Sequence, residues 1–174
     1  MKAPSIIALC GDINTLPEML SQAHSRHKRL LLHLDLFGGI GKDKAGVEYL
    51  ARLGVPGVIT TKPHLGKLAR AAGMLVIQRL FLMDSEALRS GLALVKTLQP
   101  DALEILPASV PAWVVAELRQ TTGLPLLAGG LVATPADVAA AIANGICAVS
   151  TSNRALWDLT VDDLGLVAYN NSGK

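Results

Sequence analysis

The stretch LPLLAGGLVATPADVAAAIANGICAVSTSN (residues 124–153) predicts a strand, a helix and a second strand in succession. The helix has a clear start, because Thr134 can cap it, Pro135 suits its first turn and Asp137 complements the helix dipole there. Gly145 is the usual left-handed end of such a helix. The apolar runs on either side have the composition of buried strands. The stretch is therefore interpreted as one strand–helix–strand unit.

Both strands of this unit end in residues that suit an anion. The first is followed by two glycines, which let the backbone approach a ligand closely, and the second by four residues with polar side chains. These residues are Gly129, Gly130, Ser150, Thr151, Ser152 and Asn153. In a β/α barrel the loops after the last two strands form a common phosphate site, because backbone N–H groups and a helix N-terminus converge there. The alternative is structural, with glycines that ease a turn and hydroxyls that cap a helix. The two turns in succession favour phosphate binding.

The same order of strand, loop and helix recurs along the chain. Further strands are expected at residues 6–10, 29–36, 57–61, 75–82 and 102–106, and helices near residues 16–23, 45–53, 65–72, 85–97, 111–122 and from 154 onward. Glycine ends four of the predicted helices just before a strand, at Gly54, Gly73, Gly123 and Gly145. Strands that alternate with helices in this way predict the α/β class and a parallel sheet.

The fold expected from this alternation is a TIM-barrel-like β/α barrel. A barrel is favoured over an open doubly wound sheet because no dinucleotide-binding fingerprint follows the first strand. A regular barrel has eight strands in about 250 residues. Only about seven strands are visible in this sequence, so the barrel is predicted to be one βα unit short.

The bulk composition fits one domain around a buried sheet. Hydrophobic residues make up 51% of the 174 residues, and the mean hydropathy is +0.41. A parallel sheet covered on both faces produces such a bias, and no stretch has the pattern of a transmembrane helix or a signal peptide. Cys10 and Cys147 are expected to be small core residues in a reducing, cytoplasmic compartment. Residues 1–159 are predicted to form the single domain, and residues 160–174 a flexible tail.

Charged side chains are expected at the carboxyl ends of the strands, where the chemistry of β/α barrels lies. Strand alternation places His33 and Asp35 on one face, and Lys62, Arg79 and Glu104 hold further strand ends. Lys62 and Arg79 suit a phosphate, whereas Asp35 and Glu104 suit alcohol groups. Charges that point into a barrel are costly unless they are paired or contact a ligand. The set predicts a pocket for a small phosphate with hydroxyls, and the alternative is an internal salt-bridge network.

Familiar catalytic and metal motifs are absent from the sequence. Residues 37–43 resemble a P-loop, but Leu36 replaces the first glycine and Asp43 replaces the Ser or Thr that would hold magnesium. This segment is expected to be a flexible loop over the barrel mouth. The four histidines show no ligand spacing and no Gly-x-Ser-x-Gly elbow is present, so no metal, cofactor or catalytic residue is assigned.

The densest basic segment is HSRHKR, residues 24–29. It falls between a helix and a strand, on the face expected to lie opposite the ligand mouth. Arg26, Lys28 and Arg29 are the candidate RNA contacts, and the alternative is that they complement the dipole of the preceding helix. An aromatic content of 3% argues against a module that stacks bases on aromatic platforms.

Six ordered segments closely resemble the glycerol-3-phosphate-responsive antiterminator family, the glycerol uptake operon antiterminators of bacteria. They are LLLHLDLFGGIGKDKAGVEYL (30–50), GVITTK (57–62), VIQRLFLMDS (76–85), LEILP (103–107), LLAGGL (126–131) and AVSTSNRALW (148–157). The resemblance implies a TIM-barrel-like regulator that senses glycerol 3-phosphate as its effector. It also implies that the protein binds the leader mRNA of glycerol catabolic genes and prevents premature termination of transcription.

The sequence departs from that family in one respect. Members generally begin with a further strand and helix before the segment that matches residues 6–13, and this sequence lacks that unit. A barrel without its first strand exposes unpaired edges. It is expected to close with seven strands, to pair with another subunit in a homo-oligomer, or to have acquired a different activity.

Two other functions compete with the regulator. One is a sugar-phosphate enzyme of the aldolase, epimerase or isomerase type, in which Lys62 forms a Schiff base or Asp35 and Glu104 exchange protons. The other is a structural protein without a ligand, which the paired phosphate turns disfavour. Polar groups at strand ends serve a binding pocket as well as a catalytic site, so the regulator without turnover is the preferred hypothesis.

Overall fold

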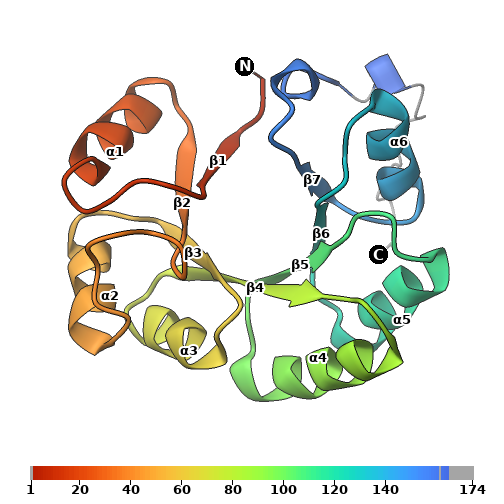
Figure 1. Cartoon of the computed structure of the whole chain (residues 1–174), viewed down its shortest axis with the longest axis horizontal. Coiled ribbons are helices and arrows are strands. Elements are labelled where there is room, and N and C mark those ends of the chain that lie inside the picture. The colour runs from red at the N-terminus through yellow and green to blue at the C-terminus, as the bar shows by residue number, and fades with distance from the viewer. Residues whose placement is uncertain (1, 161, 165–174) are drawn as a thin grey trace, which may run out of the picture.

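Seven parallel strands form one sheet in the computed structural model, which describes residues 2–160 and 162–164 (Figure 1). The strands are β1 (Ser5–Ala8), β2 (Arg29–His33), β3 (Gly57–Thr60), β4 (Leu75–Phe81), β5 (Ala102–Leu106), β6 (Leu126–Gly129) and β7 (Ala148–Ser150). Each strand pairs with the next along the chain, in the order β1 to β7. The sheet curls into a nearly closed barrel, which confirms the predicted TIM-barrel-like α/β class.

Six helices return the chain from one strand to the next on the outside of the barrel (Figure 1). They are α1 (Leu16–Ser25), α2 (Lys44–Arg52), α3 (Pro63–Ala71), α4 (Ser85–Leu98), α5 (Ala112–Thr122) and α6 (Pro135–Ala143), followed by the short 3-10 turns η1 (Arg154–Leu156) and η2 (Asp162–Leu164). Thr134 and Asp137 form a reciprocal capping box at the start of α6, as their spacing predicts. The four glycines predicted to end helices all have positive φ, between 66° and 96°.

Apolar side chains fill both sides of the sheet. Two clusters lie between strands and helices, one built around Leu32 and Val58 in the first half of the chain and one around Leu103 and Ile105 in the second. A smaller cluster lies inside the barrel and consists of Leu31, Ile59, Ile77 and Ala102, with Ile7 and Leu127 packed against it. Both faces of the central strands are therefore buried, which explains the high hydropathy without a membrane. No helix of the described part is long and apolar enough to cross a membrane.

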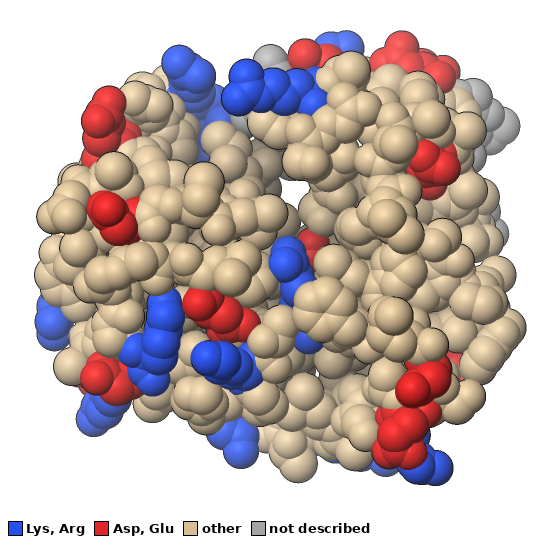
Figure 2. All heavy atoms as spheres, viewed as in Figure 1, with Lys and Arg blue, Asp and Glu red and all other residues tan. Residues whose placement is uncertain are grey.

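The edges of the sheet, β1 and β7, do not pair with each other along the described residues. Main-chain groups join the two sides elsewhere, because Ala3 N donates to Trp157 O at 3.1 Å and Lys2 N donates to Asp158 Oδ1 at 2.5 Å. The space-filling view shows an opening in this region, between the two halves of the molecule (Figure 2). The barrel is thus held at its seam by a few contacts of the chain ends rather than by a continuous strand ladder.

Two expectations about the strands were wrong. β2 ends at His33, because the amides of Leu36 and Phe37 both donate to the carbonyl of His33 and turn the chain; Leu36 is therefore 58% exposed instead of lying on a strand face. Cys10 and Cys147 are exposed free cysteines and not core residues, since Cys10 lies after the end of β1 and Cys147 lies just before the start of β7.

The predicted tail begins at residue 160. Thr160 accepts and donates hydrogen bonds with Asp163, and Leu164 packs against a small cluster made by Val132, Val138 and Leu156. Residues 161 and 165–174 lie outside the described residues, so the prediction of a flexible tail stays a prediction.

Candidate ligand-binding site

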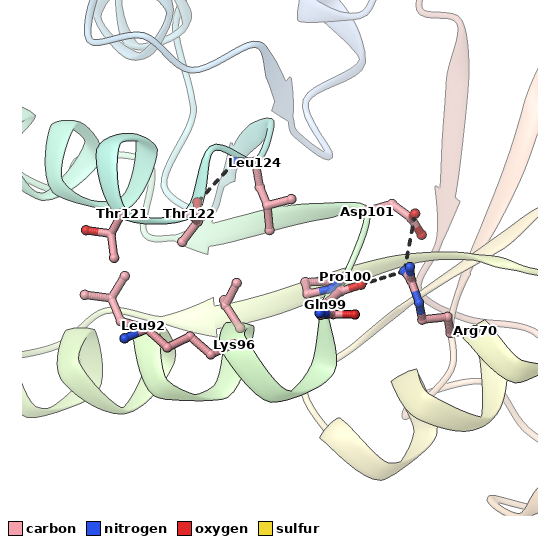
Figure 3. Close-up of a pocket in the computed structure, with 10 residues that line it drawn as sticks. Arg70, Leu92, Lys96, Gln99, Pro100, Asp101, Thr121, Thr122 and Leu124 are labelled. Carbon is pink, nitrogen blue, oxygen red and sulfur yellow. Dashed lines mark hydrogen bonds and ion pairs between the residues drawn. The ribbon is translucent and has the colours of Figure 1, made fainter.

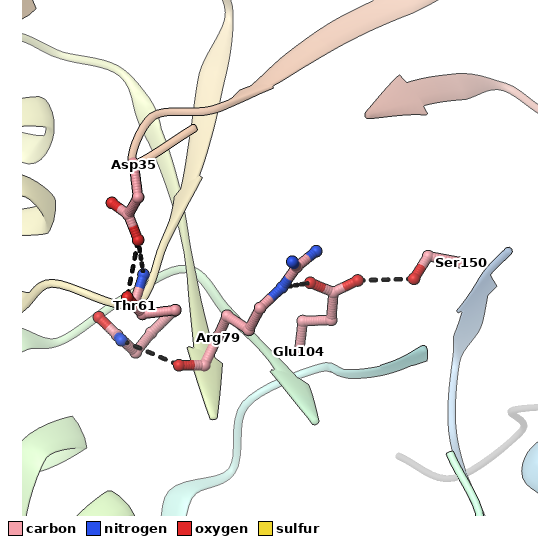
Figure 4. Close-up of polar contacts among 6 residues, drawn as sticks. Asp35, Thr61, Arg79, Glu104 and Ser150 are labelled. Carbon is pink, nitrogen blue, oxygen red and sulfur yellow. Dashed lines mark hydrogen bonds and ion pairs between the residues drawn. The ribbon is translucent and has the colours of Figure 1, made fainter. Parts of the chain in front are cut away.

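Three strands bring one acid, one base and one hydroxyl together at the carboxyl end of the barrel (Figure 4). Glu104 on β5 is in register with Arg79 on β4, and Arg79 Nε donates to Glu104 Oε2 at 2.7 Å. Ser150 on β7 donates through Oγ to Glu104 Oε1 at 2.6 Å. Both carboxylate oxygens of Glu104 therefore have partners. We call these three residues the Glu104 cluster.

The Glu104 cluster is almost sealed from solvent. The side chain of Glu104 is fully buried and that of Arg79 is 11% exposed. A buried charge is tolerated only when it is paired and hydrogen-bonded, and the Arg79 guanidinium and the Ser150 hydroxyl supply that pairing.

Gly129 is required for this arrangement. It pairs with Ser150 across β6 and β7, and a Cβ at Gly129 would lie 2.3 Å from Ser150 Oγ and 3.3 Å from Glu104 Oε1. Real Cβ atoms do not approach that closely, so any larger residue would push the hydroxyl away from the carboxylate. The first glycine of the predicted phosphate turn thus also makes room for the acid beside it.

The second carboxylate, Asp35, lies on the other side of the barrel at the end of β2. Its Oδ1 accepts a hydrogen bond from the Thr60 hydroxyl, and its Oδ2 accepts from the Thr61 main-chain N–H at 2.8 Å and the Thr61 hydroxyl at 2.7 Å (Figure 4). Burial alone would raise the pKa of Asp35, but these hydrogen bonds outweigh it and lower the pKa below its usual value. We call Asp35, Thr60 and Thr61 the Asp35 cluster.

Lys42 lies in the loop of residues 37–43 and fixes it to the end of β2. Its Nζ donates to the carbonyl of Leu34 and, at 2.6 Å, to the carbonyl of Phe37. Burial lowers the pKa of Lys42, the charge of Asp35 opposes that change and the charge of Lys62 adds to it. Lys42 was not predicted as a site residue; a lysine inside a glycine-rich loop after a strand is the signal that could have found it.

Lys62 was expected to point into the barrel, but the structure places it elsewhere. It is exposed, and its main-chain N–H donates to the Thr60 hydroxyl at 3.0 Å at the start of α3. An exposed lysine does not have the desolvated surroundings that activate a Schiff-base nucleophile. Lys62 remains a candidate for a phosphate on the Asp35 side of the mouth.

His33 and Gln78 are two further buried polar groups. His33 is 3% exposed and in register with Ile59 of the interior cluster, and its Nδ1 has no hydrogen-bond partner among the described residues. Burial lowers the pKa of His33, and the charge of Arg79 lowers it further against the opposite effect of the two acids. Gln78 pairs with Thr60, on the strand face opposite to Arg79, and donates to the Arg79 carbonyl at 3.1 Å. His33 therefore belongs to the interior and Gln78 to the helix side.

The two predicted phosphate turns lie side by side. Thr151 Oγ1 donates to the Val132 carbonyl at 3.0 Å, and Asn153 Nδ2 donates to the Ala133 carbonyl at 2.8 Å. The indole of Trp157 also donates to the carbonyl of Thr151, at 2.8 Å. The side chains of Thr151 and Asn153 thus hold the two turns together. Neither the phosphate-binding interpretation nor the structural interpretation of the turns predicted this role.

The remaining residues of these turns differ in exposure, and Gly129 is buried. Gly130 is exposed with a φ of +74°, the left-handed region that favours glycine. Ser152 is exposed, and Ser150 is partly buried at the Glu104 cluster. Within residues 2–160 and 162–164, no three His, Cys, Asp or Glu residues are grouped so that they could hold a metal ion. The candidate RNA contacts Arg26, Lys28 and Arg29 lie at the far end of the barrel, between α1 and β2.

Comparison with known proteins shows which family has this architecture. Residues 1–157 match the family described as glycerol-3-phosphate responsive antiterminator. The chain belongs to this family. An uncharacterized protein, YgcP of Escherichia coli (strain K12), is 35% identical over 158 residues, which cover 88% of this chain and 81% of that protein.

Two solved structures agree with the assignment to the antiterminator family. The glycerol uptake operon antiterminator regulatory protein from Listeria monocytogenes str. 4b F2365 is 34% identical with a TM-score of 0.84, covering 92% of this chain and 86% of that one. A glycerol uptake operon antiterminator-related protein from Thermotoga maritima MSB8 is 29% identical with a TM-score of 0.81, covering 90% and 88%. The resemblance predicted from the sequence is therefore confirmed.

Proposed function

We propose that this protein is a cytoplasmic transcription antiterminator that binds glycerol 3-phosphate and the leader mRNA of glycerol catabolic genes. Membership of the glycerol-3-phosphate responsive family supports the effector and the regulatory role. The observation that carries the proposal is the buried Glu104 cluster beside two adjoining turns at the carboxyl end of the barrel. Ligands of β/α barrels bind at this end.

The phosphate of the ligand lies between the turns at Gly129–Gly130 and at residues 150–153 in this proposal. Backbone N–H groups and the exposed hydroxyl of Ser152 supply neutral donors, and Arg79 supplies the positive charge. Lys62 is the second candidate cation, on the Asp35 side of the mouth. Thr151 and Asn153 contribute by holding the two turns at the spacing that the phosphate needs.

Binding of the phosphate exchanges partners within the Glu104 cluster. The guanidinium of Arg79 has five N–H groups. Its Nε–H donates to Glu104, so the other N–H groups can donate to phosphate oxygens. The carboxylate of Glu104 is an acceptor that suits the hydroxyl groups of the glycerol part, and Asp35 is the second such acceptor. An effector with both a phosphate and neighbouring hydroxyls therefore provides partners for the Arg79 guanidinium and for the Glu104 carboxylate at once. Inorganic phosphate or glycerol alone provides a partner for only one of these two charges.

Two observations support the proposal of an mRNA partner: membership of the antiterminator family and the basic turn after α1. Arg26 and Arg29 are exposed and Lys28 is partly exposed, at the end of the barrel away from the effector. Effector and RNA then bind distinct sites, so a change in RNA affinity requires coupling through the barrel, and the coupling is reciprocal. The role is regulation without turnover.

Calorimetric titration with glycerol 3-phosphate, glycerol and inorganic phosphate tests the effector half. We expect heat of binding for glycerol 3-phosphate at concentrations where the other two give none, and loss of that heat in Arg79→Gln. Lys44→Gln is the matched control, because Lys44 is an exposed cation paired only with Glu48 on the surface. Equal responses to the three compounds, or turnover of sugar phosphates by the wild-type protein, would contradict the proposal.

A labelled leader RNA tests the other half. We expect binding that weakens steeply with salt and that tightens when glycerol 3-phosphate is added. The converse measurement, effector affinity with and without RNA, must change by the same factor. RNA affinity that does not respond to the effector would defeat the antiterminator role even if the effector binds.

A further inference from the structure

Basic residues gather at the carboxyl ends of the helices. Arg52 ends α2, and Arg70, Lys96 and Arg119 lie in the last turns of α3, α4 and α5. Arg26, Lys28 and Arg29 surround the turn between α1 and β2. All strands are parallel, so these helix ends lie at one end of the barrel, opposite the Glu104 cluster. We call this end, with the turns that join each helix to the next strand, the amino face.

Acidic residues are nearly excluded from the amino face. Asp101 is the one acid in the turns between α1–α6 and the strands that follow them, all of which are described. Arg70 is engaged there, because it donates to the Gln99 carbonyl at 2.5 Å and lies 3.6 Å from Asp101. Lys96 and Arg119, in contrast, form no ion pair or side-chain hydrogen bond with another described residue. The amino face thus has unpaired positive charge.

Two adjoining hollows mark the same face. One, of about 600 Å³, lies between the ends of α4 and α5 and is lined by Arg70, Lys96, Thr121 and Thr122 among others (Figure 3). The second, of about 660 Å³, lies between the end of α5 and the turn before β7 and includes Arg119 and Gln120. Leu124 lines both hollows, so the two shallow hollows adjoin each other. Cations, hydroxyls and amides are the groups that bind phosphate and sugar oxygens.

A single cation at a helix carboxyl end is explained by the helix dipole. That explanation does not account for three cations between α1 and β2, nor for adjoining hollows lined by the cations of neighbouring helices. The guanidinium of Arg119 lies across the α6–β7 turn, where a Cβ at Gly145 would be 2.2 Å from its Nη1. Arg119 and Gly145 both line the second hollow.

We propose that the amino face binds the phosphate backbone of RNA, with the strand running from the α1–β2 turn across the hollows beside α4 and α5. This inference rests on the proposed function and assigns its RNA surface to Arg52, Arg70, Lys96 and Arg119 in addition to the α1–β2 turn. Few aromatic side chains occur in the chain, so the contact reads the backbone rather than stacked bases. RNA and effector occupy opposite ends of the barrel and do not compete.

Fluorescence anisotropy with a labelled pool of random 30-nucleotide RNAs tests the inference. In the double variant Lys96→Gln/Arg119→Gln we expect the RNA affinity at 0.15 M salt to fall about tenfold. The slope of log affinity against log salt concentration should become shallower by about 1.4, because each lost contact with a single-strand phosphate removes about 0.7. Lys44→Gln/Arg89→Gln is the matched control, because it removes two exposed cations from the opposite ends of α2 and α4. The control should bind RNA as the wild type does.

The outcomes separate this inference from the proposed function. Wild-type affinity and slope in the Lys96/Arg119 variant, with a normal melting temperature, would overturn the RNA surface while leaving antitermination in place. Absence of any RNA binding by the wild-type protein with glycerol 3-phosphate present would contradict the proposed function itself. Should the variant fail to fold, ultraviolet cross-linking of RNA to the wild-type protein decides: cross-links in the helix-to-strand turns support the inference, and cross-links confined to the carboxyl ends of the strands overturn it.

Discussion

Asp35 and Glu104 are carboxylates at strand ends of the same barrel, but they are held in different ways. Asp35 is bound by one main-chain N–H and two hydroxyls of Thr60 and Thr61, at the end of β3, and it is partly exposed. Glu104 is fully buried, and its partners are side chains from two other strands. One donor to Asp35 is a main-chain N–H, which is fixed in place, whereas both partners of Glu104 are side chains that can turn toward a new partner. The comparison assigns Asp35 chiefly to shaping the mouth and Glu104 to exchange with a ligand.

The largest expected effect is at Glu104. Replacement by alanine leaves the Arg79 guanidinium nearly buried and unpaired, so the free energy of unfolding should fall by about 3–5 kcal/mol. Saturating glycerol 3-phosphate should return part of that loss, because its phosphate replaces the missing negative charge. Urea denaturation with and without effector measures both. If Glu104→Ala lowers the free energy of unfolding by less than Asp35→Ala does, the assignment of the two carboxylates is reversed.

Gly129→Ala should have the next largest effect. The added methyl group would meet Ser150 Oγ and must displace it from Glu104, a cost of about 1–3 kcal/mol for overpacking. Effector affinity should fall as well, since the same movement shifts the turn after β6. Gly73→Ala is the control for effector affinity: alanine is strained at its positive φ of 78°, but Gly73 lies at the opposite end of the barrel and a Cβ there meets no atom within 4 Å. Equal effector affinity in the two variants would contradict the proposed role of Gly129.

Asp35→Asn should lower stability by about 1–2 kcal/mol at neutral pH, because an amide replaces an acceptor that three donors approach. The pKa of Asp35 is lowered by folding, so its contribution is complete above about pH 4 and is lost as the pH falls through the folded value. The difference between wild type and variant should therefore shrink below pH 4 in urea denaturation. A constant difference from pH 6 to pH 3 would show that the charge of Asp35 does not matter.

The smallest effect is expected at His33. Burial lowers its pKa in the folded protein, so its neutral form is favoured, and stability should decline as the pH falls below about 6.5, the value in the unfolded chain. His33→Leu should remove this part of the decline between pH 7 and pH 5, and His24→Leu, an exposed histidine, should leave it. Addition of effector should also change the slope in the wild type, because Arg79 contributes to the shift.

Local patterns made much of the fold predictable. The capping residues of α6 and the glycines that end helices act within a few positions of themselves, so residues 124–153 could be interpreted without knowledge of the rest. Arg79 and Glu104 were found because strand ends of a parallel barrel share one face. The same reasoning extended β2 too far, since the turn at Leu36 depends on hydrogen bonds to the His33 carbonyl rather than on composition.

Residues whose role depends on distant partners were missed. Lys42 binds carbonyls that come within reach only when the loop folds back on the end of β2. Thr60 and Thr61 matter because β3 lies beside β2, 25 residues or more from the carboxylate that they hold. The turns at Gly129–Gly130 and residues 150–153 were expected from the sequence, but which side chains of the second turn bind the carbonyls of residues 132 and 133 depends on the spacing of β6 and β7.

The indole of Trp157 is hydrogen-bonded to one of the two turns that are proposed to hold the phosphate, and the second tryptophan, Trp113, is 58% exposed on α5. The protein therefore contains its own optical reporter of the pocket. With Trp113 replaced by phenylalanine, a single tryptophan remains, and its emission on selective excitation should follow occupancy of the turn in real time, without a dye and without any assay of transcription.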